Sequence, residues 1–132
     1  MSRKIEDLSG EMFPLCNSWQ ERMITAGIDF LITCTSRLKS EQIELYKKGR
    51  KLENGVWFVI NPKACVTWTL ESKHLTGDAF DFVIMVNGKP DWKMVHKDLW
   101  EKAVEIGKSL GLKQAVDKKG KVLEYAHLQK GN

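Results

Sequence analysis

Two histidines in this sequence stand near acidic residues, in two stretches that are far apart along the chain. His74 precedes Asp81 by seven residues, and Glu124 precedes His127 by three. Two imidazoles and one carboxylate form a ligand set that suits Zn²⁺, and three protein ligands leave the fourth tetrahedral position to water. The pattern predicts a catalytic metal site, although either pair alone is also typical of a hydrogen-bonded histidine and acid.

The spacing of Glu124 and His127 constrains the backbone between them. On a regular strand, residues three apart point to opposite faces, whereas a general base and a metal ligand must converge on one site. We therefore expect a turn or a strand end there. In that geometry Glu124 would accept the proton of a metal-activated water and pass it to the leaving amine, and the predicted reaction is hydrolysis of an amide or an ester.

The ligands His74 and Asp81 match no single helix face, so we expect a loop that runs into a strand. Residues 78–86 are rich in Phe, Val and Ile, which predicts the strand. Gly77 permits the positive φ of a tight turn just before it. Because alternate strand residues share a face, Asp81 should face the site with the small side chain of Ala79. The other residues on that side are Val83 and Met85, and those packing behind are Phe80, Phe82, Ile84 and Val86.

The remaining elements follow from apolar periodicity and from turn residues. Helices are predicted over residues 8–26, with Pro14 at the start or at a kink, from the N-cap Ser40 to Gly49, and over residues 97–110. Strands are predicted over residues 28–34, 57–60 and 112–116 and from 122 onward, and residues 50–73 form a long excursion around the second of these. Asn87-Gly88 predicts a hairpin turn. This order favours a small α+β domain, with helices packed on a mainly antiparallel sheet.

Length and composition limit the classes of protein to consider. The chain has 132 residues, of which 42% are hydrophobic, and this supplies a real core and excludes intrinsic disorder. Its net charge of +4 indicates a mild affinity for anionic surfaces, but the basic residues are spread out, which argues against a nucleic-acid partner. We find no secretory signal and no window long enough to span a membrane.

Several conspicuous side chains have a structural interpretation. Three cysteines at wide spacing, Cys16, Cys34 and Cys65, form no closed disulfide framework and are interpreted as small core residues. Trp19 and Trp100 fit the core, whereas Trp68 fits either the core or a cleft wall. His96 is interpreted as a surface or capping residue. The basic cluster of Lys47, Lys48, Arg50 and Lys51 is interpreted as a solvated helix end, where the helix dipole favours cations.

Taken together, the two stretches resemble the signature of the M15 family of zinc peptidases, which cleave peptidoglycan. The matching residues are Ser72, His74, Gly77, Ala79 and Asp81, followed by Glu124 and His127. Ser36-Arg37, Gln42, Leu45-Tyr46 and Gly49-Arg50 are similar to the upstream pattern of the branch that contains bacteriophage L-alanyl-D-glutamate peptidases. The resemblance extends from the first helix to about Gln129.

The resemblance implies a role for each matching residue. One Zn²⁺ per chain would be held by His74, Asp81 and His127, with Glu124 as the catalytic base. Arg37 would stabilise the developing oxyanion, although pairing with a nearby acid is an alternative. Ser72 would bind substrate or order the loop. The fold implied is that of the Hedgehog and DD-peptidase group, and residues 1–132 would form a single catalytic domain without a separate wall-binding domain.

The resemblance also implies a biological setting. We expect a monomeric endolysin that hydrolyses the L-alanyl-D-glutamate bond of peptidoglycan, made in the host cytoplasm and acting in the periplasm after release by holin, without stable membrane insertion. Alternatives are a D,D-carboxypeptidase or dipeptidase of the same family and a non-catalytic wall-binding module. Residues 113–123 depart from the Trp- and Gly-rich stretch of related endolysins, because they are polar and basic. This stretch bears on the substrate subsite.

Overall fold

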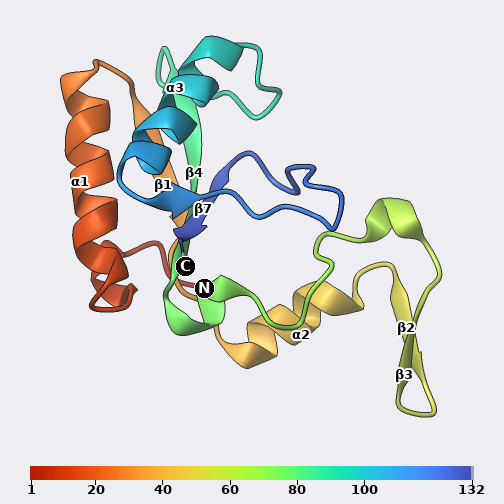
Figure 1. The fold of residues 1–132 in the computed structure, drawn as a ribbon. Coiled ribbons are helices and arrows are strands. Elements are labelled where there is room, and N and C mark those ends of the chain that lie inside the picture. Colours follow the sequence, from red (N-terminus) through yellow and green to blue (C-terminus); the bar gives the residue numbers. More distant parts are fainter. Residues whose placement is uncertain (132) are drawn as a thin grey trace.

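The computed structural model describes residues 1–131. Four strands lie side by side in the main sheet, and helices pack against it (Figure 1). The strands of the main sheet are β1 (Phe30–Cys34), β4 (Ala79–Val86), β7 (His127–Lys130) and β6 (Leu112–Lys113), in that spatial order, and β5 (Lys89–Pro90) pairs with β4. Every pairing is antiparallel. The helices are α1 (Met12–Thr25), α2 (Lys39–Lys47) and α3 (Lys97–Ser109). The predicted α+β architecture is confirmed.

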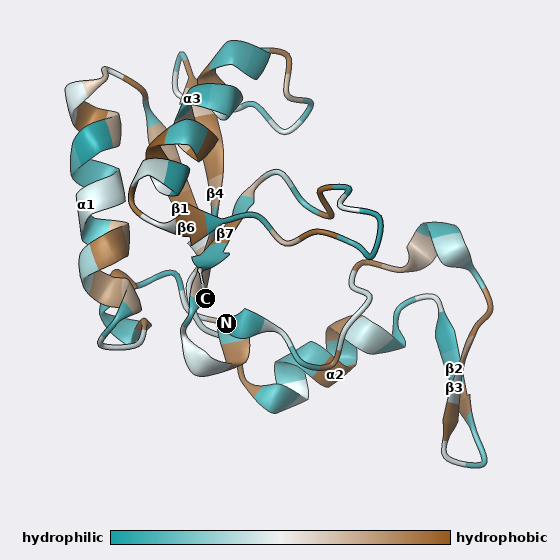
Figure 2. Cartoon of the chain, viewed as in Figure 1, coloured by the Kyte–Doolittle hydropathy of each residue, from teal (hydrophilic) through white to brown (hydrophobic). Residues whose placement is uncertain are grey.

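The core lies between the sheet and the helices α1 and α3. Trp19 of α1 is fully buried and contacts Phe80 and Phe82 of β4, with ring centroids 5.0 and 4.9 Å away. Its indole N–H donates to the carbonyl oxygen of Ala103 at 2.9 Å, which joins α1 to α3. Trp100 of α3 stacks on Phe82 from the other side. The predicted core positions of both tryptophans are confirmed, and Figure 2 shows hydrophobic residues concentrated on β1 and β4.

Several element boundaries differ from those predicted, and the strand predicted over residues 112–116 covers only Leu112–Lys113. The first helix begins at Met12, not at residue 8, and a short 3₁₀ turn (Ile5–Asp7) precedes it. The helix α2 is preceded by Leu38 as N-cap, so Ser40 lies inside it. Leu38 makes no side-chain cap hydrogen bond, and Glu41, the third residue of the helix, accepts the backbone N–H of Leu38 at 2.9 Å, as the glutamate of a capping box does. The last strand begins at His127, and residues 116 and 122 form only an isolated bridge.

Residues 50–73 contain two strands where one was predicted. β2 (Arg50–Glu53) and β3 (Val56–Val59) pair as a separate hairpin. Asn54 and Gly55 both have positive φ, at 50° and 79°, as do Asn87 and Gly88 in the predicted β4–β5 hairpin, at 51° and 74°. The same Asn-Gly signal therefore specifies both reversals.

The β2–β3 hairpin corrects two predictions about side chains. Arg50 is buried, not solvated, because its guanidinium lies 3.9 Å from the ring centroid of Tyr46 and 5.0 Å from that of Trp68. Trp68 itself is exposed and lies outside the core. Cys16 and Cys34 are buried as predicted, whereas Cys65 is only half-buried, and all three thiols are free. In residues 1–131 no helix combines the length and the apolar character needed to cross a bilayer.

Candidate metal centre

The loop before β4 places His74 against the sheet. A 3₁₀ turn (Lys73–Thr76) carries His74, and Ser72 caps it by accepting the backbone N–H of His74 at 3.2 Å. Gly77 ends the turn with a φ of 72°, and a Cβ added there would lie 2.7 Å from the backbone nitrogen of Ser9. The tight turn predicted at this glycine is confirmed. Ser72 orders the loop, and its predicted contact with substrate stays a prediction.

Antiparallel pairing of β4 with β7 brings the second stretch to the first. Asp81 is directly opposite His127 in the register, and the two side chains share a face of the sheet. Glu124 comes just before the turn at residues 125–126, and the strand begins at His127. The predicted turn between Glu124 and His127 is therefore confirmed, and it allows both side chains to approach Asp81.

The predicted ligands converge on one carboxylate oxygen. His74 Nε2 lies 3.1 Å from Asp81 Oδ1, and His127 Nδ1 lies 2.9 Å from the same oxygen. The two imidazole rings are nearly perpendicular, with centroids 5.0 Å apart. Candidate ligand atoms of Asp81, Glu124 and His127 all lie within 4.8 Å of one another. The four residues predicted from the two separate stretches therefore form one cluster.

The outer nitrogen of each imidazole has its own acceptor. His74 Nδ1 lies 3.3 Å from the carbonyl oxygen of Thr35, and His127 Nε2 lies 3.0 Å from Oε1 of Gln129. A metal-ligating histidine usually donates its second ring N–H to such an acceptor, which fixes the tautomer and the ring orientation. The inner nitrogens are thereby left to a cation shared with Asp81.

The donor set fits zinc. Bonds of about 2.0–2.2 Å in a tetrahedral site separate neighbouring ligand atoms by about 3.3 Å, close to the two distances between the imidazole nitrogens and Asp81 Oδ1. The set is His74 Nε2, Asp81 and His127 Nδ1, which is the nitrogen and oxygen chemistry of catalytic zinc sites.

The pKa values of His74 and Asp81 move in opposite directions because the two side chains contact each other. Burial lowers the pKa of His74, but hydrogen bonds with Asp81 and Cys34 outweigh it and raise the pKa to about 10. Burial raises the pKa of Asp81, but the hydrogen bonds with His127 and His74 have the larger combined effect and lower the pKa to about 2. Asp81 therefore carries a negative charge at neutral pH, and a divalent cation bound by His74 would displace a proton from that imidazole.

Glu124 has the environment of a general base. Its side chain is exposed at the edge of the cluster, yet partial desolvation of the carboxyl group raises its pKa, and the negative charge of Asp81 raises it further. Nearby positive groups, including Arg37, act in the opposite direction. A carboxylate with a raised pKa accepts and returns a proton more readily near neutral pH.

Arg37 lies beside this cluster and is held by two neighbours. Its Nη1 donates to Oε1 of Gln42 at 2.7 Å, and its Nη2 approaches Sγ of Cys34 at 3.7 Å. Its Nε is buried without a partner, and no carboxylate within residues 1–131 forms an ion pair with it. Pairing with a nearby acid was the alternative role for Arg37, and among the residues that the structure describes no such ion pair is found.

Several residues of the site were not predicted. Cys34 was interpreted as a core residue, but its Sγ lies 3.7 Å from His74 Nδ1, on the side of the ring away from Asp81. Gln129 could have been found, since residues two apart on a strand share a face with each other. Thr35 and Gln42 contribute through contacts between distant segments, which no local spacing reveals. His96 is exposed and lies outside the cluster, as predicted.

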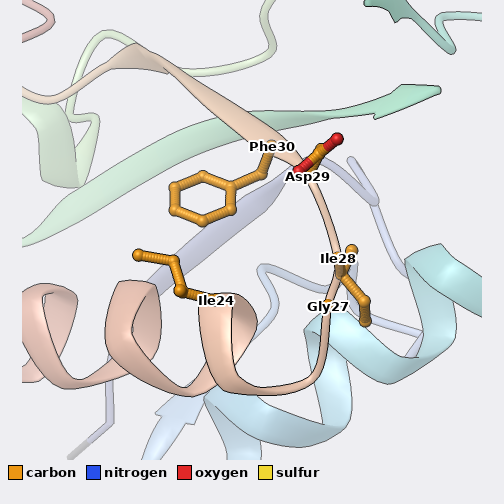
Figure 3. Close-up of a pocket in the computed structure, with 5 residues that line it drawn as sticks. All are labelled: Ile24, Gly27, Ile28, Asp29 and Phe30. Carbon is orange, nitrogen blue, oxygen red and sulfur yellow. The ribbon is translucent and has the colours of Figure 1, made fainter. Parts of the chain in front are cut away.

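A hollow elsewhere on the surface has no part in this centre. Figure 3 shows it at the connection between α1 and β1, where Ile24, Ile28 and Phe30 surround it together with Gly27 and Asp29. None of these residues belongs to the cluster of His74, Asp81, Glu124 and His127, which is the candidate functional site.

Comparisons with known proteins show what the whole chain resembles. No family model matches the chain. Over 70 residues, 51% of this chain, it is 39% identical to the L-alanyl-D-glutamate peptidase of Escherichia phage T5, and it spans 45% of that relative. The structure superimposes on the L-Ala D-Glu endopeptidase ChiX of Serratia marcescens with a TM-score of 0.65 and 18% identity, over 96% of this chain and 82% of that one. The chain is therefore homologous to the phage L-alanyl-D-glutamate peptidase and has the fold of the ChiX endopeptidase.

Proposed function

We propose that this protein is a zinc-dependent endolysin that hydrolyses the L-alanyl-D-glutamate amide bond of peptidoglycan stem peptides. The observation that carries the proposal is the placement of Glu124 beside Asp81 and His127, since a structural site needs no free carboxylate at its edge. Homology to the phage T5 peptidase supports the choice of bond. Zinc is the metal proposed, at one ion per chain.

Each residue of the site has a distinct task in the proposed reaction. His74, Asp81 and His127 hold the ion, which when bound acidifies a coordinated water and polarises a carbonyl oxygen. Glu124 accepts a proton from the attacking water and returns it to the leaving amine. Arg37, oriented by Gln42, stabilises negative charge on the carbonyl oxygen of the scissile bond. Ser72 holds the loop that carries His74 and is also proposed to contact substrate.

The proposed setting is lysis of a bacterial host by a phage. The protein is made in the host cytoplasm and reaches the periplasm through holin pores, where it acts as a monomer without inserting stably into a membrane. Its net charge of +4 favours encounter with anionic wall components, and this attraction weakens with salt.

The test is digestion of purified sacculi by purified protein, with and without a chelator, followed by mass analysis of the products. The proposal predicts new N-terminal glutamate, loss of activity with chelator and recovery when zinc is added back. Release of D-alanine instead would identify a D,D-carboxypeptidase or dipeptidase. Sedimentation with sacculi without new termini would identify a wall-binding module, and either result overturns the proposal.

A further inference from the structure

The register of the sheet places one lysine on the same face as the metal ligands. Asp81 is paired with His127, and two residues along each strand Ala79 is paired with Gln129. Gln129 is in turn paired with Lys113 on β6. Directly paired residues project from the same face of a sheet. Lys113 therefore projects from the face that carries Asp81 and His127, beside the residue that contacts His127.

Burial of the neighbouring residues confirms this orientation. Leu112 and Leu128 are 3% and 0% exposed and belong to the core on the other side of the sheet. Lys113 follows Leu112 directly and therefore faces away from the core. Its side chain is half-buried, and within residues 1–131 its ammonium group forms no ion pair. The ammonium group of Lys113 is therefore available to a ligand bound on the face of the sheet that carries Asp81 and His127.

Lys113 and Arg37 lie on opposite sides of the ligands. The strand order β1-β4-β7-β6 puts the ligands Asp81 and His127 on the two inner strands. Arg37 contacts Cys34 at the end of β1, whereas Lys113 is on β6. Two cations thus flank the centre, and Arg37 is held in place by Gln42, whereas Lys113 has no such partner.

The proposed substrate has a matching charge. Glutamate has two carboxyl groups, so a glutamate that continues the peptide through one of them keeps the other as a free carboxylate beside the scissile bond. Asp81 and Glu124 would repel that carboxylate, and a cation on the same face would offset the repulsion. An ammonium group offers a compact charge with three donors for this contact.

We propose that Lys113 is a specificity-determining residue that binds the free carboxylate of the glutamate on the leaving side of the scissile bond. This inference rests on the proposed function. The proposal also gives a function to the basic stretch at residues 113–123, because Lys113 is the first residue of that stretch.

The test compares two synthetic stem peptides that differ in one group, the free carboxylate of this glutamate or its amide. For the wild type we expect kcat/KM to be about ten- to a hundredfold higher for the acid, the range typical of a hydrogen bond to a charged group. Lys113→Met keeps the apolar stem and removes the charge, so kcat/KM for the acid peptide should fall about ten- to a hundredfold and the preference for the acid should disappear. Lys118→Met, at an exposed position in the segment that follows β6, is the matched control and should keep the preference.

Zinc content and melting temperature of each variant establish that it is folded and loaded. A Lys113→Met protein that still prefers the acid overturns the inference, as does a wild type that cleaves both peptides equally well, and in these two cases the proposed function stands. A wild type that cleaves neither peptide overturns the proposed function and this inference together.

Discussion

Oε1 of Gln129 lies 3.0 Å from Nε2 of His127, the ring nitrogen that faces away from Asp81. This contact fixes which nitrogen of His127 is left for the metal. Gln129→Met keeps the size of the side chain and removes the acceptor. We expect zinc affinity to fall about 10–100-fold, the usual cost of losing such a partner, measured by competition with a chromophoric chelator.

Gln20→Met on α1 serves as the control for the Gln129 variant, because Gln20 lies outside the cluster and should leave zinc affinity unchanged. Equal affinities for the Gln129 variant and the wild type would show that the contact does not orient His127.

Glu124→Gln should separate catalysis from metal binding. The amide has the shape of the carboxylate but cannot accept the proton of the attacking water. We expect release of N-terminal glutamate from sacculi to fall about 10²–10⁴-fold, with zinc content still near one ion per chain by elemental analysis. Glu21→Gln, on the exposed side of α1, should keep full activity. Undiminished hydrolysis by the Glu124 variant would remove this residue from the role of base.

Gly77→Ala should destabilise the protein more than Gly88→Ala does. Both glycines have positive φ, 72° and 74°, so both substitutions strain the backbone by about 1 kcal/mol. Only at Gly77 would the new Cβ meet backbone, 2.7 Å from Ser9, whereas nothing lies within 4 Å at Gly88. We expect an additional loss of about 1–3 kcal/mol in the free energy of unfolding, measured by urea titration. Equal losses at the two positions would contradict the close approach.

Asp78 should make the loop that carries His74 sensitive to acid. The hydroxyls of Ser9 and Thr76 each donate to its carboxylate at 2.7 Å and lower its pKa below the ordinary value of 3.8. A lowered pKa in the folded state gives stability that is present above this value and is lost as the pH falls below it.

Asp78→Asn should therefore be less stable than the wild type at neutral pH, with a difference in melting temperature that narrows below about pH 4. Melts followed by circular dichroism between pH 2 and 7 measure this difference. Asp29→Asn has an exposed side chain and should follow the wild-type pH profile. If the melting temperatures of Asp78→Asn and the wild type differ by the same amount throughout this pH range, ionisation of Asp78 does not contribute to stability.

Much of the fold was predictable because its signals are local. The stripe containing Trp19 and the alternation around Phe80 and Phe82 specify which faces are buried, and these agree with the structure. The first strand of the β2–β3 hairpin, β2, was missed although Asn54-Gly55 repeats the signal at residues 87–88. Ser40 was chosen as N-cap from its type alone, but the structure satisfies the helix start with Glu41 instead.

The cluster of His74, Asp81, Glu124 and His127 was predictable because few residue types can form a site with zinc-type chemistry. The chain has three histidines, and the two chosen from the sequence, His74 and His127, are the two that contact Asp81. The contacts of Cys34 and Gln42 could not be predicted in this way. Each depends on packing between segments whose spatial relationship is set by the complete fold, as the bond from Gln42 to the carbonyl oxygen of Thr69 illustrates.

The pairing of Asp81 with His127 joins residues 46 positions apart, and the intervening chain includes the β4–β5 hairpin and α3. Contacts between distant positions form slowly, because the entropy of closing the loop opposes them until neighbouring contacts are in place. Ion uptake during refolding should therefore lag behind the appearance of helical signal in stopped-flow experiments. Partly folded chains would then lack the complete cluster of His74, Asp81 and His127.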